Sequence, residues 1–133
     1  MKLTAYLNFD GQAEAAIGFY KDLFDARVSS LMRFSDAPAE MDFPQEMASK
    51  IMHCSLDFAG GAFQLSDSLQ DEVVMGNAIY LSVAAESSAE AHALFAGLSS
   101  GGEVIMALGE VFWGGIFGMT RDKFGVQWMV SAP

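Results

Sequence analysis

The order of the predicted elements repeats in the two halves of this 133-residue chain. The first half begins with a short apolar strand, continues with a helix whose apolar residues recur every three or four positions, and ends with three strands. The strands are expected at residues 3–9, 27–34, 51–58 and 62–66, with the helix between Asp10 and Asp25. Gly60-Gly61 suits a tight turn between the last two strands.

The second half has the same order of strand, helix and three strands. The strands are expected at residues 78–83, 104–108, 112–119 and 126–131. Ser87–Glu90 has the spacing of a capping box and opens the helix, which Gly101-Gly102 ends. The residues repeat weakly as well. Ala13–Ala15 matches Ala89–Ala91, and Tyr6-Leu7 resembles Tyr80-Leu81.

This repeat predicts the architecture. A four-stranded sheet with a helix on one face leaves its other face open, and pairing two such units closes a cleft. We therefore predict an α+β fold in which a single domain, residues 1–133, contains two βαβββ modules that form a cleft. The first module is expected at about residues 1–68, the connection at 69–77 and the second module at about 78–133.

Charge and hydropathy narrow the function classes. The chain has 17 acidic and seven basic residues, a formal charge of −10, and its Lys and Arg residues are scattered, which argues against a nucleic-acid partner. The longest run without charged residues, Val73–Ala85, is shorter than the roughly 18 apolar residues that a membrane helix needs. The N-terminal apolar run is too short for a signal sequence, so we expect a cytoplasmic protein without a membrane partner.

Several features favour contact with a second subunit. The mean hydropathy of +0.27 is high for a soluble monomer. The connections at residues 35–49 and 67–77 are long and carry apolar side chains, so each is expected to form a lid or to reach a partner. Cys54 is the only cysteine, and strand alternation puts it on a helix-packed face, where a thiol is inert.

Two motifs in the second half make the chain recognisable. Glu110–Gly118 contains Phe112-Trp113-Gly114, and Asp122–Met129 begins Asp-Lys-Phe-Gly-Val. With these motifs the chain resembles the PhnB-like branch of the vicinal oxygen chelate superfamily, which includes glyoxalase I, bleomycin-resistance proteins and extradiol dioxygenases. The resemblance extends to Tyr6–Gly11, Ala16–Tyr20, Met32–Phe34, Ile51–His53 and Leu65–Ser68. Some members carry a label as ubiquinone-pathway methyltransferases, but this chain has no glycine-rich strand-to-helix loop to cradle a nucleotide or S-adenosylmethionine.

The resemblance also implies where a metal would be held. Metal-dependent members of the superfamily bind a divalent ion through His or Glu at four positions, and these positions fall here at Ala5, Gln64, Ala78 and Met129. Alanine cannot bind a metal, and a thioether is a poor ligand for hard or borderline ions. We therefore expect no divalent metal and no cofactor at this site, which puts glyoxalase, dioxygenase and thiol-transferase activities in doubt.

Strand alternation indicates which side chains line the cleft. If the face with Cys54 packs under a helix, His53 and Ser55 face the concave side, and Gln64 and Ser66 do the same on the next strand. His53 is the best candidate for proton transfer. The alternative, that it is a hydrogen-bonded structural histidine, is the more common role for a lone histidine in a strand.

Aromatic residues could complete the cleft. Trp113 and Phe117, with Phe112, could form a flat wall for an apolar ligand, and Tyr80 could add a hydroxyl group. Aromatic side chains in strands more often belong to a core or an interface, so this alternative stays open.

These observations lead to three hypotheses. The first is a metal-free, homodimeric protein that binds a small organic molecule in an apolar cleft. The second is a metal-independent isomerase or lyase acting on a small carbonyl compound, with His53 as base and Gln64, Ser66 or Tyr80 polarising the substrate. The third is a structural dimer whose cleft is filled by its own side chains. The ligand is open at this point, and so is whether the cleft lies within one chain or between two.

Overall fold

A computed structural model describes residues 1–69 and 72–133 of the chain. They form two compact units, Met1–Val73 (unit 1) and Val74–Pro133 (unit 2). The predicted connection, residues 69–77, therefore lies partly outside the described residues. Within the described part of the chain, no helix is both long and apolar enough to cross a membrane.

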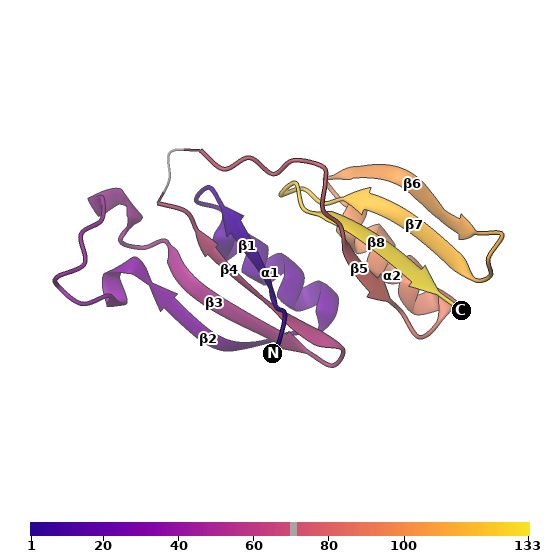
Figure 1. Ribbon diagram of the computed structural model, residues 1–133, viewed down its shortest axis with the longest axis horizontal. Helices are drawn as coiled ribbons and strands as arrows, with labels where there is room; N and C mark the ends of the chain where they lie inside the picture. Colours follow the sequence, from indigo (N-terminus) through magenta and orange to yellow (C-terminus); the bar gives the residue numbers. More distant parts are fainter. Residues whose placement is uncertain (70–71) are drawn as a thin grey trace. The chain divides into compact units, whose positions relative to one another are not determined.

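Unit 1 is a four-stranded sheet with one helix on its surface (Figure 1). Its elements are β1 (Ala5–Phe9), α1 (Ala13–Phe24), β2 (Arg27–Arg33), β3 (Ile51–Phe58) and β4 (Gly61–Asp67). The 3₁₀ turns η1 (Phe34–Asp36) and η2 (Gln45–Met47) lie between β2 and β3. The strand order is β1-β4-β3-β2, in which β1 and β4 are parallel and the other pairs are antiparallel.

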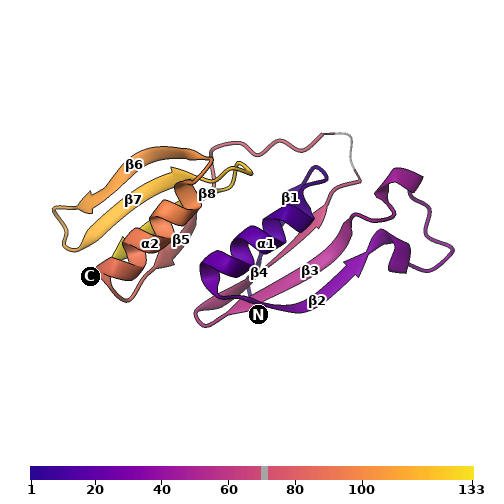
Figure 2. The same ribbon diagram turned by 180° about the vertical axis from the view of Figure 1, so that it is seen from behind.

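Unit 2 repeats this topology. Its elements are β5 (Leu81–Ala84), α2 (Ser88–Ser99), β6 (Glu103–Glu110), β7 (Ile116–Arg121) and β8 (Gln127–Ala132). The order is β5-β8-β7-β6, again with a parallel first pair, and α2 covers one face of the sheet (Figure 2). The predicted α+β fold with two βαβββ modules is therefore confirmed.

Two strands of unit 2 begin later than expected. β5 begins at Leu81 rather than Ala78, and β7 begins at Ile116 rather than Phe112. Gly114 and Gly115 explain the second difference, because both have φ in the left-handed region, +103° and +77°. A Cβ atom on Gly115 would lie 2.3 Å from the carbonyl oxygen of Ala132, so only glycine fits this turn.

The core of each unit lies between its helix and the sheet. In unit 1, Tyr20 of α1 packs edge-on against Phe63 of β4, with 5.3 Å between ring centroids. Cys54 and Leu65 are fully buried on the same face, as expected for Cys54. In unit 2, Gly118 lies beneath Phe95 of α2, whose ring comes within 2.9 Å of the place where a Cβ would be. Fully burying a large apolar side chain stabilises a fold by about 1.5–3 kcal/mol.

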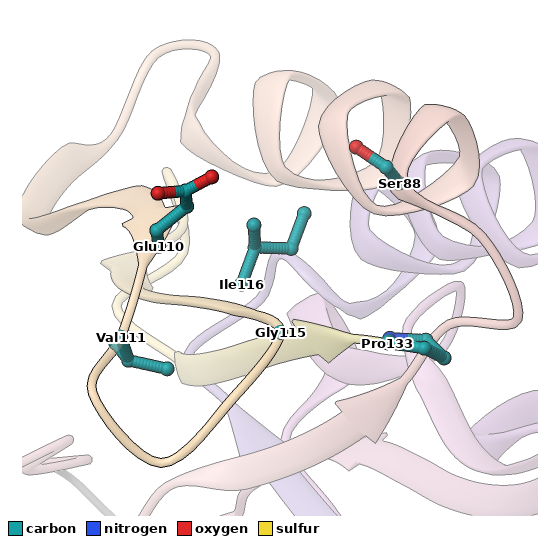
Figure 3. A pocket seen from close by; sticks show the side chains of 6 residues that line it. All are labelled: Ser88, Glu110, Val111, Gly115, Ile116 and Pro133. Carbon is teal, nitrogen blue, oxygen red and sulfur yellow. The ribbon is translucent and has the colours of Figure 1, made fainter.

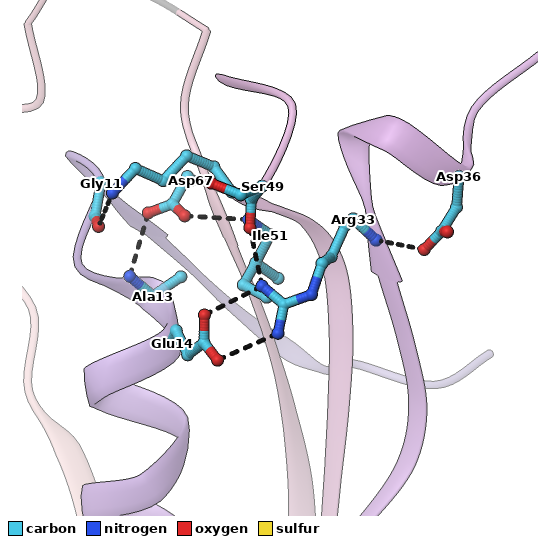
Figure 4. Close-up of polar contacts among 9 residues, drawn as sticks. Gly11, Ala13, Glu14, Arg33, Asp36, Ser49, Ile51 and Asp67 are labelled. Atoms are coloured by element: carbon cyan, nitrogen blue, oxygen red, sulfur yellow. Dashed lines mark hydrogen bonds and ion pairs between the residues drawn. The ribbon is translucent and has the colours of Figure 1, made fainter. Parts of the chain in front are cut away.

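Each helix start is fixed in a different way. The first hydrogen bond of the capping box expected in the second half is present. Ser87 Oγ accepts it from the Glu90 amide at 3.1 Å. In α1 the capping acceptor comes from β4, a strand distant in the sequence. The carboxylate of buried Asp67 accepts bonds from the amides of Ala13, at 2.9 Å, and Ile51, at 3.0 Å (Figure 4).

An ion pair secures the connection between β2 and β3. The Arg33 guanidinium donates to both carboxylate oxygens of Glu14 at 2.9 Å and to the carbonyl of Ser49 at 2.6 Å (Figure 4). The hydrogen bonds and the charge from Arg33 lower the pKa of Glu14. Because Glu14 is in the first turn of α1 and Ser49 closes the connection, this pair ties the predicted lid segment to the helix.

Candidate functional site in unit 1

The helix-free face of the unit 1 sheet is mainly polar. Phe63 and Leu65 of β4 are buried under α1, so Gln64 and Ser66 between them face the other way. The registers pair Gln64 with Tyr6 and with Ser55. The polar side chains on this face include Tyr6, Asn8, His53, Ser55, Gln64 and Ser66, and the exposed Met32 of β2 lies opposite His53. The fold thus brings together four of the residues expected to line the cleft: His53, Ser55, Gln64 and Ser66.

His53 lies at the centre of a chain of hydrogen-bonding groups on this face. Its Nδ1 is 3.2 Å from the Tyr6 hydroxyl oxygen, and its Nε2 is 3.2 Å from Ser55 Oγ. The Tyr6 and His53 rings are 5.8 Å apart. Either neutral tautomer satisfies both contacts, because a hydroxyl group can donate or accept. His53 is half-buried and Tyr6 is 46% exposed, so this row of hydrogen-bonded side chains reaches the surface of unit 1 at Tyr6.

This arrangement has a defined chemical capacity. The imidazole ring can accept a proton at one nitrogen and release one at the other, and here each nitrogen has a hydroxyl neighbour. Beside it, Ser66 Oγ donates to the Asn8 amide oxygen at 3.4 Å. The face therefore presents donors and acceptors to a ligand, with His53 positioned to exchange a proton.

Tyr6 was not among the predicted site residues, and the register shows why. Ala5 was expected on the concave side, but it is in register with Phe63 and therefore lies on the face toward α1. Tyr6, one residue later, is opposite Gln64. A shift of one residue moves a side chain to the other face of a strand. The apolar residues Leu7 and Phe9 alternate with Tyr6, and that pattern could have identified it.

The correction in unit 2 has a different cause, because β5 begins after the expected residue. Ala78 is exposed and precedes β5, and Tyr80 also lies before this strand. The residue in register with Met129 is Ser82. The four positions that correspond between the two units are therefore Tyr6 and Gln64 in unit 1, and Ser82 and Met129 in unit 2.

The helix-free face of unit 2 combines thioether and aromatic side chains with the polar residues Ser82, Gln127 and Ser131. Trp128 and Val130 are buried under α2, so Met129 faces away from the helix, and Met119 and Phe117 follow it on β7. The Trp113 ring stacks edge-on against Phe117 at 5.8 Å, which brings this predicted aromatic pair together. Trp113 is 62% exposed.

A separate hollow of about 360 Å³ lies where β6 ends and α2 begins (Figure 3). It is lined by Ser88, Glu110, Val111, Gly115, Ile116 and Pro133. None of the predicted site residues contributes to it. Its polar side chains, Ser88 and Glu110, come from the start of α2 and the end of β6.

Among residues 1–69 and 72–133, no group of three or more His, Cys, Asp or Glu side chains is placed to hold one metal ion. The side chains at the four corresponding positions are a phenol, an amide, a hydroxyl and a thioether. This donor set lacks the His and carboxylate ligands that zinc sites use.

Comparison with known proteins identifies the family. The family described as 3-demethylubiquinone-9 3-methyltransferase matches residues 1–131. Protein YjdN of Escherichia coli is 28% identical, over 98% of this chain and 95% of its own length. Two solved structures that cover nearly the whole chain are similar. Protein PA1353 from Pseudomonas aeruginosa is 33% identical with a TM-score of 0.86, over 99% of this chain and 97% of its own. A protein from Bacillus cereus, described as a putative 3-demethylubiquinone-9 3-methyltransferase and PhnB protein, is 28% identical with a TM-score of 0.84, over the full length of both chains.

More distant structures share the fold. A glyoxalase-related enzyme from Fulvimarina pelagi is 15% identical with a TM-score of 0.61, over 100% of this chain and 89% of that one. The fosfomycin resistance protein FosX from Listeria monocytogenes is 11% identical with a TM-score of 0.66, over 100% of this chain and 93% of that one. The chain therefore belongs to the family described as 3-demethylubiquinone-9 3-methyltransferase, and over its full length it is similar to a structure described as a PhnB protein.

Proposed function

We propose that this protein binds a small organic molecule and that the polar helix-free face of unit 1 contacts the polar atoms of this ligand. The observation that carries the proposal is His53, whose two ring nitrogens each lie 3.2 Å from a hydroxyl oxygen on a partly exposed surface. An imidazole whose orientation is fixed in this way is prepared to recognise a ligand. Gln64, in register with Tyr6 and Ser55, adds an amide that both donates and accepts.

The proposal does not use a divalent metal at the superfamily positions. Tyr6, Gln64, Ser82 and Met129 occupy the corresponding strand positions. None of them is a His, Cys, Asp or Glu, the residues that hold zinc in proteins. The ligand is therefore held by hydrogen bonds and apolar contact.

A thermal-shift screen of the full chain, treated with a chelator, tests this proposal. A ligand present at 100 times its Kd adds about 2.7 kcal/mol to stability, which raises the Tm by roughly 10 °C. We expect stabilisation by an organic compound alone, and we expect His53→Ala to abolish it. His92→Ala, which removes a histidine on α2, is the matched control. A metal required for binding, or equal shifts in both variants, would contradict the proposal.

A second candidate is a metal-independent isomerase or lyase that acts on a small carbonyl compound. It is favoured by the hydroxyl groups on both sides of His53, which suit a base that takes up and returns a proton. Gln64 or Ser66 would polarise the carbonyl group. Tyr80 was a third possibility for this role, but Tyr6 is the phenol beside His53. If a compound from the screen is turned over, His53→Ala should abolish turnover with the fold intact, and unchanged kinetics would exclude this candidate.

Methyl transfer, the activity named in the family description, is not part of this proposal. The loop from β1 to α1, residues 10–12, contains a single glycine, whereas a nucleotide cradle at this place uses several. A binding assay of the full chain with S-adenosylmethionine tests this alternative, and saturable binding would support methyl transfer.

We also propose that the protein is a cytoplasmic homodimer. Large apolar side chains are exposed in unit 2, including Val74 and Ile79 before β5 and Phe112 after β6. Exposed apolar surface of this kind favours a subunit interface. Sedimentation velocity should give twice the mass of one chain, and a monomer at micromolar concentration would contradict the dimer. Cell fractionation tests the location.

A further inference from the structure

Three methionines lie side by side across the helix-free face of unit 2. Met106 of β6 is in register with Met119 of β7, and Met119 is in register with Met129 of β8. The pairing of β6 with β7 shifts register on both sides of Met106, and between these shifts Met106 pairs with Met119. The row therefore crosses three neighbouring strands.

The spacing of strands allows the three sulfur atoms to approach one another. Neighbouring strands are about 4.8 Å apart, so the outer two methionines are about 10 Å apart at the backbone. Methionine has three rotatable side-chain bonds, and both outer side chains can lean over Met119. Trp128 and Val130 are buried under α2, so the row faces away from the helix. Met106 is 39% exposed and the other two are half-buried, which leaves the row accessible within unit 2.

Thioether sulfur is a soft ligand. It binds Cu(I) well and binds hard or borderline ions such as Mg²⁺ and Zn²⁺ poorly. We propose that Met106, Met119 and Met129 bind Cu(I) through their sulfur atoms. The ion binds and leaves as Cu(I), so no electron is transferred. This inference is independent of the proposed function, which concerns unit 1.

The neighbouring side chains are compatible with a bound cation. Arg121, two residues from Met119 on the same strand face, is paired with Glu103 at 3.1 Å and also donates to the Gln127 side chain at 2.7 Å. Its charge is therefore balanced locally. On the other side of the row, Phe117 lies two residues from Met119 with Trp113 against it. The faces of aromatic rings attract cations.

Titration of the full chain with Ag⁺, a redox-inert substitute for Cu(I), gives a direct test by NMR. The chain has nine methionines, and each methyl group can be followed after ¹³C labelling. We expect saturable shifts at Met106, Met119 and Met129 and at no other methionine, with no response to Mg²⁺. Absence of shifts, or shifts at a different set of methyl groups, would overturn the proposal.

Affinity for Cu(I), measured anaerobically by competition with a chromophoric chelator, gives the second test. Met119→Leu should weaken binding by more than about 10-fold, the effect that even an outer-shell partner has on metal affinity. Met41→Leu, in the unit 1 connection, is the matched control and should bind as the parent does. Cys54→Ala excludes the buried thiol as the ligand. Equal affinity of Met119→Leu and the parent, or loss of binding in Cys54→Ala alone, would overturn the proposal.

Discussion

The two units have the same topology, but their helix-free faces carry different chemistry. Where β1 and β4 pair in unit 1, the facing residues are Tyr6 and Gln64; where β5 and β8 pair in unit 2, they are Ser82 and Met129. Unit 1 adds an imidazole and hydroxyl groups, whereas unit 2 adds thioether and aromatic side chains. The helix-facing positions are alike, with a buried aromatic residue, Phe63 or Trp128, at the same place. Packing against a helix therefore constrains one face of each sheet and leaves the other free for function.

The connections between the second and third strands of the two units also differ. In unit 1, residues 34–50 between β2 and β3 contain two 3₁₀ turns and are tied to α1 through Arg33. In unit 2 the equivalent connection, residues 111–115, is a tight turn with Phe112 and Trp113 exposed. In unit 1, the connection after β2 is therefore long and anchored to the helix. In unit 2, the connection after β6 is short and carries two exposed aromatic side chains.

The largest expected effect concerns the reactivity of Cys54, which reports on unit 1. Burial raises the pKa of this thiol to about 11. We expect a thiol-disulfide reagent to react with the native protein at least about 100-fold more slowly than with the unfolded chain, because the thiolate is the reactive form.

Both tryptophans are in unit 2, so their fluorescence reports on that unit. If the denaturant midpoint measured by Cys54 reactivity differs from the midpoint measured by tryptophan fluorescence, the two units unfold separately.

Removing one fully buried leucine from each unit compares the stability of the two cores. Leu65 of β4 and Leu98 of α2 are both fully buried. Leu65→Ala and Leu98→Ala should each lower the free energy of unfolding by about 2–5 kcal/mol, through lost burial and the cavity left behind. Urea unfolding measures both. A loss below about 1 kcal/mol for either variant would contradict the packing described for that unit.

The buried carboxylates give a smaller effect. Asp67 joins α1 to β3 through two backbone amides, whereas Asp122 joins the turn after β7 to the indole of Trp128 at 2.9 Å. Hydrogen bonds to a charged group are worth about 1.5–3 kcal/mol, so Asp67→Ala and Asp122→Ala should each cost about that amount or more. Asn at either position should restore part of the loss, because its oxygen still accepts. Equal stability of the Ala and Asn variants would show that the hydrogen bonds contribute nothing.

The smallest effect comes from the exposed ion pair in unit 1. Arg33 lowers the pKa of Glu14 below its ordinary value of 4.5 in the folded protein. The stabilisation is therefore complete above the ordinary value and is lost as pH falls through the lowered one. Glu14→Gln should reduce the acid-side slope of Tm against pH, while Glu103→Gln, which removes the single contact with Arg121, should change it less. An unchanged slope in Glu14→Gln would show that the pair does not stabilise the protein.

Local patterns predicted most of the elements of this fold. Apolar periodicity located both helices, and the capping sequence at Ser87 identified the start of α2. Alternation placed His53, Ser55, Gln64 and Ser66 on one face of unit 1. The cap of α1 could not be predicted, because Asp67 lies 54 residues beyond Ala13 in the chain and reaches it only when β4 pairs with β1.

The amino-acid sequence by itself determined the repeated order of strands and helices and which face of each strand is apolar, because these depend on the local period of the side chains. Only the tertiary structure decided which residues are neighbours across strands. Register placed Tyr6 rather than Ala5 beside Gln64, the later start of β5 placed Ser82 beside Met129, and register aligned Met106, Met119 and Met129. The physical reason is that register arises from pairing between distant segments, and a shift of one residue exchanges the two faces of a strand.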